Sequence, residues 1–164
     1  MTIRVGIIGA TGYTALETYR LLLRHPEAQV TVATSRSEVG QSIAQIHPVL
    51  AGQASLTLTA YDPEAIAREC DVAMCCLPHG ASAESVRELV NAGVRVIDFS
   101  ADFRLSDAAI YAHHYGVEHT WSPTPAVILS QRSSRWDRCS STMRSIRVIS
   151  SLTRRVALAV RDVR

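Results

Sequence analysis

Three glycines spaced three residues apart, Gly6, Gly9 and Gly12, follow an apolar run near the start of the chain, with Thr11 and Thr14 beside them. Glycine tolerates positive φ and lets a phosphate approach the backbone without a Cβ in the way. The free amides at the start of a helix attract anions, and threonine hydroxyls add donors. The pattern predicts a dinucleotide site, although a glycine-rich turn that binds nothing is the alternative. The residues predicted to contact the cofactor here are Gly9, Thr11, Gly12, Tyr13 and Thr14.

A second polar group, Ser35, Arg36 and Ser37, stands at the end of the next apolar run. A site that prefers NAD usually has an acidic residue here for the ribose 2′-hydroxyl, whereas an arginine accommodates a 2′-phosphate. The first carboxylate in this region is Glu38. A guanidinium flanked by hydroxyls therefore favours NADP over NAD. The alternative is an ordinary solvated arginine.

The cysteines predict neither a disulfide framework nor a metal site, because their spacing matches no zinc motif. Cys75 and Cys76 are adjacent in an apolar run, so on a strand their side chains point to opposite faces. We interpret both as small buried hydrophobic residues.

The elements that must position these residues alternate between strand and helix patterns over residues 1–120, which predicts an α/β fold. We expect a Rossmann-like, doubly wound parallel sheet. The predicted strands are residues 3–8, 29–33, 55–59, 71–77 and 95–99. The predicted helices are residues 14–24, 39–46, a short helix opened by 62–64, residues 81–91 and residues 106–111.

Composition changes sharply near residue 120. Residues 1–120 carry 8 arginines and 13 acidic residues, whereas residues 121–164 carry 9 arginines and 2 acidic residues, and the chain has no lysine. All 8 glycines lie at or before Gly116. We therefore divide the chain into an NADP-binding domain, 1–120, and an irregular basic tail, 121–164. A basic tail could contact a polyanion, but Trp136 is its only aromatic residue after 121, so no nucleic-acid partner is expected.

Neither a membrane-length apolar run nor a basic leader with a cleavable apolar stretch is visible. We therefore expect a cytoplasmic protein with no membrane partner.

Three further segments resemble one enzyme family: the Leu-Pro-His-Gly motif at 77–80, the Ser-Ala-Asp-Phe-Arg motif at 100–104, and Tyr-Gly-Val-Glu at 115–118. Together with the opening glycine turn, their order and spacing resemble the N-acetyl-γ-glutamyl-phosphate reductases of arginine biosynthesis. The resemblance covers residues 1–120.

The resemblance implies a reductase that converts an acyl phosphate, N-acetylglutamyl phosphate, to the semialdehyde with NADPH through a cysteine thioester. The segment with Pro78, His79 and Gly80 would border the nicotinamide. Ser100 and Arg104 would lie near the substrate phosphate. For Arg104 the alternative is a surface ion pair with a neighbouring aspartate.

The family's Asn-Pro-Gly-Cys-type nucleophile motif and its later catalytic histidine do not occur in this sequence. Cys139 has arginines nearby that could lower its pKa, yet no candidate base accompanies it, so no catalytic residue is assigned. The sequence thus predicts the cofactor-binding part of such an oxidoreductase, catalytically incomplete as it stands. A shifted reading frame or a splice near Thr120 would explain the tail, and the other two frames of the coding DNA would test this. A non-enzymatic NADP-binding or regulatory module is the alternative function.

Overall fold

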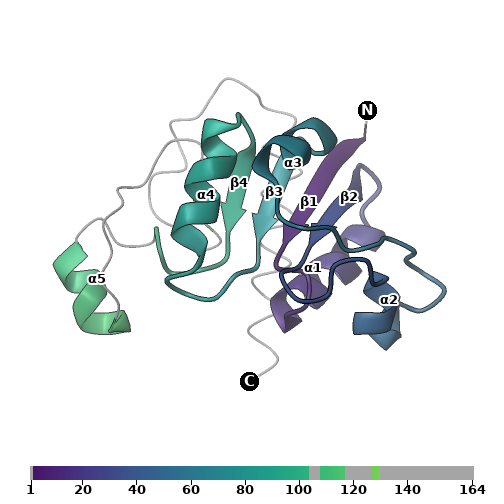
Figure 1. Cartoon of the computed structure of the whole chain (residues 1–164), viewed down its shortest axis with the longest axis horizontal. Helices are drawn as coiled ribbons and strands as arrows, with labels where there is room; N and C mark the ends of the chain where they lie inside the picture. Colours follow the sequence, from purple (N-terminus) through teal and green to yellow (C-terminus); the bar gives the residue numbers. More distant parts are fainter. Residues whose placement is uncertain (1, 104–107, 117–126, 130–164) are drawn as a thin grey trace.

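The computed structural model describes residues 2–103, 108–116 and 127–129. Its centre is a five-stranded sheet with the order β2-β1-β3-β4-β5, and every neighbouring pair of strands is parallel. The strand arrows in Figure 1 therefore point the same way, and the loops that follow them gather at one end of the sheet. The strands are β1 (Ile3–Ile8), β2 (Ala28–Thr34), β3 (Val72–Cys75), β4 (Arg95–Asp98) and β5 (Val127–Leu129).

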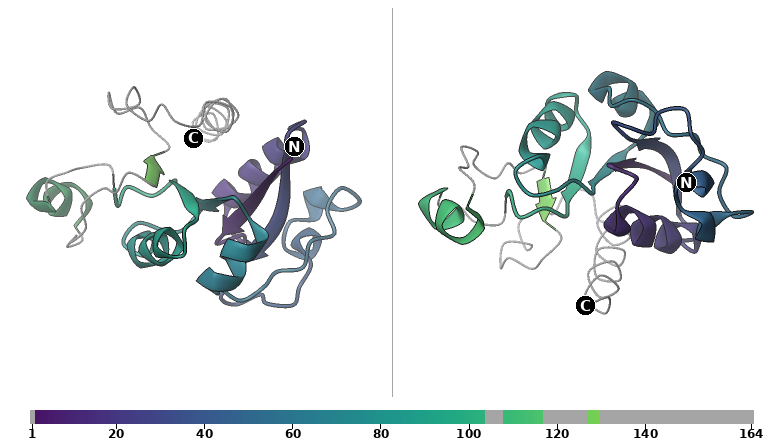
Figure 2. Two further views of the ribbon diagram at one scale, coloured as in Figure 1. Left: turned by 90° about the horizontal axis from the view of Figure 1, so that it is seen from above. Right: turned by 60° about the horizontal axis from the view of Figure 1, so that its bottom comes forward.

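Helices cover both faces of the sheet, as the views in Figure 2 show. One face packs against α1, and the other packs against α3 and α4. The helices are α1 (Tyr13–Leu23), α2 (Ile43–Ile46), the 3-10 turn η1 (Pro48–Leu50), α3 (Pro63–Glu69), α4 (Ser82–Asn91) and α5 (Ala108–Tyr115). This arrangement confirms the predicted doubly wound α/β fold.

Alternation along the strands creates two separate cores. In β3, Val72 and Met74 belong to the core beneath α1, whereas Ala73 and Cys75 belong to the core beneath α3 and α4. Cys75 is fully buried, and its neighbour Cys76 packs against the opposite core. The two thiols thus point to opposite faces, as the two-residue period of a strand requires.

Helix ends follow the local sequence. Asp62 caps α3 by accepting hydrogen bonds from the amides of Glu64 and Ala65, at 3.0 and 3.2 Å. Pro63 occupies the first turn, where its missing amide costs nothing. After α4 the chain turns at Gly93, which has a φ of 85° that favours glycine.

The predicted strand at residues 55–59 is wrong. This segment makes only isolated bridges, between Thr57 and Ser42 and between Thr59 and Thr34. The amide of Leu58 donates to the Gln41 carbonyl at 2.8 Å, so the loop after β2 satisfies this backbone in place of a full ladder. Leu58 is nevertheless buried in the core beneath α1. The alternating pattern at residues 55–59 therefore reflects the burial of Leu58 and does not indicate a strand.

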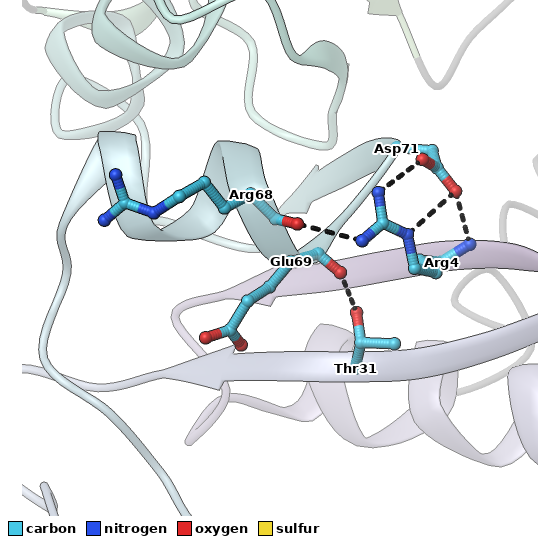
Figure 3. A network of polar contacts seen from close by, with 5 residues as sticks. All are labelled: Arg4, Thr31, Arg68, Glu69 and Asp71. Atoms are coloured by element: carbon cyan, nitrogen blue, oxygen red, sulfur yellow. Dashed lines mark hydrogen bonds and ion pairs between the residues drawn. The ribbon is translucent and has the colours of Figure 1, made fainter.

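A polar network connects β1 and β2 to the segment between α3 and β3 (Figure 3). The Arg4 guanidinium donates to both carboxylate oxygens of Asp71 and to the Arg68 carbonyl. The Thr31 hydroxyl donates to the Glu69 carbonyl at 2.7 Å. These bonds join β1, β2 and the turn between α3 and β3.

Within the tail that the sequence predicts to be irregular, residues 127–129 form β5, which pairs with β4. The rest of residues 121–164 lies outside the described residues. In the described part of the chain, no helix combines the length and apolarity needed to cross a membrane.

Candidate cofactor-binding site

The sheet changes its winding direction between β1 and β3. The chain leaves β1 for β2 on one side and returns to β3 on the other. In open α/β sheets, ligands bind outside the carboxyl ends of the strands at such a switch point. The turn at residues 9–12 follows β1 at this point, and Cys76 and Leu77 follow β3 beside it. Sequence and topology therefore indicate the same place.

Gly6, Gly9 and Gly12 have three different structural roles. Gly6 lies within β1, where an added Cβ would come within 3.0 Å of a Val32 methyl and 3.1 Å of the Cys70 sulfur. Gly9 has a φ of 80°, and an added Cβ would lie 2.8 Å from a Leu77 methyl. At Gly12 an added Cβ would meet no protein atom within 4 Å. Gly6 thus serves packing and Gly9 the turn, while Gly12 leaves open space at the start of α1.

The N-terminus of α1 is arranged to receive an anion. Gly12 is its N-cap residue in extended conformation, with no side-chain cap, and no acidic residue lies in the first turn. The first helical hydrogen bond runs from the Leu16 amide to the Gly12 carbonyl, so the preceding amides have no partner within the helix. Thr11 and Tyr13 are exposed and Thr14 is partly buried. Amides and helix dipole together favour a phosphate here.

A small pocket connects this turn to the end of β2. Gly9, Ser35, Arg36 and Leu77 line it, together with Tyr61. Ser35 is buried and its hydroxyl accepts from the Glu38 amide, whereas Arg36 and Ser37 are exposed. The structure thus brings the predicted arginine to the same edge as the glycine turn.

The loops after β3 and β4 are locked together. The Asp102 carboxylate is fully buried and accepts from the amides of Gly80, Ser82 and Ala83, at 2.8, 3.3 and 3.2 Å. In return, the Ala101 amide donates to Nδ1 of His79 at 2.9 Å. This bond requires a lone pair on Nδ1, so the proton of the neutral ring is on Nε2. His79, Pro78 and Gly80 form an exposed loop whose backbone is fixed from below.

A second buried carboxyl, Asp98, supports the same loops. It accepts from the hydroxyls of Ser82 and Ser100, at 2.8 and 2.6 Å, and from the Ser100 amide. Burial raises the pKa of the Asp98 carboxyl above its usual value, although these hydrogen bonds lower it in part. The Ser100 hydroxyl in turn accepts from the Asp102 amide. Ser100, predicted to lie near the substrate phosphate, therefore uses its hydroxyl inside the loop scaffold.

The described cysteines are poor nucleophiles. Burial raises the pKa of the Cys70 thiol to about 11 and that of Cys76 to about 12. It also raises the pKa of the Cys75 thiol. All three thiols are therefore protonated near neutral pH. Cys139 and Arg104 lie outside the described residues.

Two residues of this site were not identified from the sequence. Tyr61 lines the pocket, and its hydroxyl donates to the Ser85 carbonyl at 2.9 Å. The buried His47 contacts the glycine turn through the Ala10 carbonyl. Each belongs to the connection between β2 and β3, and neither carries a local motif, because only the packing of that connection places it here. A polar residue within an apolar stretch, such as His47 after Ile46, was the available signal.

Comparison with known proteins shows the family to which this chain belongs. A family model described as "Semialdehyde dehydrogenase, NAD binding domain" matches residues 4–119. The chain belongs to this family. The match confirms the resemblance drawn from the opening turn and the later motifs, and it makes the site that of a domain for a nicotinamide cofactor.

Proteins with similar sequences support this family assignment. The N-acetyl-γ-glutamyl-phosphate reductase of Rhodopirellula baltica is 60% identical over 119 residues, which cover 73% of this chain and 34% of that protein. The enzyme of the same name from Polynucleobacter asymbioticus is 47% identical over 117 residues, which cover 71% and 33%. The chain thus spans about a third of the length of these relatives.

Solved structures share the fold. An aspartate semialdehyde dehydrogenase from Candida albicans, determined with NADP, has a TM-score of 0.58 at 21% identity, covering 66% of this chain and 32% of that one. Aspartate semialdehyde dehydrogenase II from Vibrio cholerae has a TM-score of 0.51 at 19% identity, covering 66% and 34%. At these identities the likeness concerns the fold.

Proposed function

We propose that residues 1–120 are an NADP-binding domain and that the chain is the cofactor-binding part of an N-acetyl-γ-glutamyl-phosphate reductase. The observation that carries the proposal is the uncapped start of α1, where the first amides have no partner within the helix and a Cβ added at Gly12 would meet no protein atom within 4 Å. The residues fit the group, because Gly9 sets the turn and Gly12 leaves room for a pyrophosphate. Thr11, Tyr13 and Thr14 would flank it.

The 2′-phosphate of NADP would lie at the end of β2. Arg36 is exposed at the pocket that also reaches Gly9, so its guanidinium can form charge-assisted hydrogen bonds with a phosphate. The 2′-hydroxyl of NAD carries no charge and would form a weaker bond there. Ser35 and Ser37 would line this position. The Ser35 amide donates to the Thr59 carbonyl and its hydroxyl oxygen accepts from the Glu38 amide, so Ser35 would contact a phosphate through its hydroxyl proton.

The nicotinamide end would lie along the loop after β3. Pro78, His79 and Gly80 are exposed there, and the fixed tautomer of His79 directs an Nε2–H donor away from Ala101. When bound, NADPH supplies a hydride, and the proposed reaction of the whole enzyme is reduction of an acyl phosphate to an aldehyde. Ser100 would shape the adjoining loop, and Arg104 would contact the substrate phosphate. The division at residue 120 is part of this proposal, with the difference that residues 127–129 of the tail add strand β5 to the sheet of the cofactor domain.

Titration of the full chain with NADPH and NADH, followed by calorimetry, tests the proposal. We expect saturable binding, tighter for NADPH than for NADH. Because charge-assisted hydrogen bonds contribute about 1.5–3 kcal/mol, Arg36→Ala should weaken NADPH binding roughly 10- to 100-fold and leave NADH nearly unchanged. Arg24→Ala is the matched control, since Arg24 is exposed at the opposite end of α1. Absence of binding, or equal losses for both cofactors in Arg36→Ala, would contradict the proposal.

A further inference from the structure

His47 lies 37 positions after Ala10 in the sequence, yet its ring contacts the glycine turn directly. Nε2 of His47 is 2.8 Å from the Ala10 carbonyl oxygen, and both residues are buried. A carbonyl oxygen can only accept, so Nε2 carries the proton and donates. The bond satisfies a carbonyl that water does not reach, in the residue immediately before Thr11 and Gly12.

The chain around His47 is held in place by its own hydrogen bonds and by the core. Ser42 and Gln45 form a capping box at the start of α2, and the His47 amide donates to the Ile43 carbonyl at 2.9 Å. Ile43 and Leu50 are buried in the core beneath α1. The imidazole therefore projects from a fixed support.

The opposite side of the same residue is held as well. The Ala10 amide donates to the Thr34 carbonyl at the end of β2, at 2.8 Å. With amide and carbonyl both bonded, the Ala10 backbone has one orientation, and that orientation sets where Thr11 and Gly12 follow. The turn is thus clamped between β2 and the connection that carries His47.

We propose that His47 is a positioning residue for the pyrophosphate-binding turn, acting through the Ala10 carbonyl and not by contact with the cofactor. This inference rests on the proposed nucleotide function. Loss of the donor leaves the buried carbonyl unsatisfied, and the turn gains freedom to rotate it toward water. Apparent affinity then falls in proportion to the fraction of molecules with the competent turn.

Two substitutions separate donor geometry from mere bulk. In His47→Gln the amide nitrogen reaches about as far as Nε2, whereas in His47→Asn it stops near the place of Nδ1. We expect His47→Gln to bind NADPH within about twofold of the unmodified chain, and His47→Asn to bind roughly tenfold more weakly, a difference of about 1.4 kcal/mol. Because NADP and NAD share the pyrophosphate, His47→Asn should weaken both by the same factor.

Two controls test a purely structural role. Ile46→Ala truncates a neighbour packed against the same core and lowers stability without touching the Ala10 carbonyl, so its affinity should match that of the unmodified chain. His25→Asn makes the same substitution at a partly exposed histidine whose Nδ1 accepts from the Glu27 amide, and it should also leave affinity unchanged.

The measurements are calorimetric titration of each full-length variant, with circular dichroism to verify folding, and ¹⁵N NMR of the imidazole nitrogens in the unmodified chain. We expect a proton on Nε2 of His47, and this measurement does not depend on whether any variant folds. Folded His47→Asn with unmodified affinity, His47→Gln as weak as His47→Asn, a matching loss in Ile46→Ala, or an Nε2 that carries no proton would each overturn the inference. If the unmodified chain itself binds neither cofactor, the proposed function fails, whereas the NMR result still reports on the hydrogen bond.

Discussion

Replacement of Asp102 by alanine should remove a large part of the stability of this domain. Its fully buried carboxylate binds the Gly80 amide at 2.8 Å and the first two amides of α4 at 3.3 and 3.2 Å. A hydrogen bond to a charged group contributes about 1.5–3 kcal/mol, and a negative charge at a helix N-terminus adds about 0.3–2 kcal/mol. Since two of the three bonds are long, we expect a loss of about 3 kcal/mol.

Urea unfolding of the full chain, followed by circular dichroism, measures this loss. With a slope of about 2 kcal/mol per M, the midpoint should fall by about 1.5 M. Asp102→Asn keeps an acceptor oxygen but loses the charge, so its effect should be intermediate. Glu84→Ala is the matched control, because Glu84 is an exposed acid in the first turn of the same helix and should cost at most about 1 kcal/mol. If Asp102→Ala unfolds at the same urea concentration as Glu84→Ala, the carboxylate does not hold these loops together.

Three further predictions concern the turn and the two ends of the sheet. Gly9→Ala should destabilise the chain by about 1–3 kcal/mol, because the φ of 80° strains an alanine and the Leu77 side chain leaves no room for a Cβ. Gly12→Ala should lower stability by at most about 1 kcal/mol but weaken NADPH binding at least about tenfold. Thermal unfolding measures the stabilities, and calorimetry measures the binding. The Arg4 guanidinium lowers the pKa of the Asp71 carboxyl through their hydrogen bond. The stabilisation by this pair is therefore present above the pKa that Asp71 has in the unfolded chain, and it is lost as pH falls through the pKa in the folded chain. In a plot of urea midpoint against pH, Asp71→Asn should reduce the fall on the acid side. Burial has the opposite effect at Asp98, because it raises the pKa of this carboxyl in the folded chain. Stability should therefore fall as pH rises from the pKa of Asp98 in the unfolded chain to its pKa in the folded chain. A ¹³C NMR titration of the carboxyl should show a midpoint above the ordinary value of about 3.9.

The sequence predicted the elements whose patterns are local. The apolar run before Gly9 became β1, and the apolar spacing after Gly12 became α1, because both patterns match the period of the element they form. The doubly wound topology followed from their alternation with later strands. The family match to residues 4–119, together with the similar reductases of the same name, then confirmed the resemblance that the motifs had indicated.

What the sequence missed depends on packing between distant segments. The alternation around Leu58 resembled a strand, but its backbone bonds go to the loop after β2, which no local pattern reveals. His47 contacts Ala10 only because α2 packs on the core beneath α1. Likewise, Asp102 caps a helix that begins 20 residues earlier, so its role needs the fold and not the motif.

Amide NMR of the full chain during titration with NADPH tests the central claim, that the start of α1 binds the cofactor's pyrophosphate. We expect saturable shifts that are largest at the amides of residues 11–15 and smaller at the Ser35–Ser37 segment. The amides of Arg4 and Asp71, which lie near the starts of β1 and β3, should not move. Shifts that fail to saturate, or that are largest around Arg4 and Asp71, would contradict it.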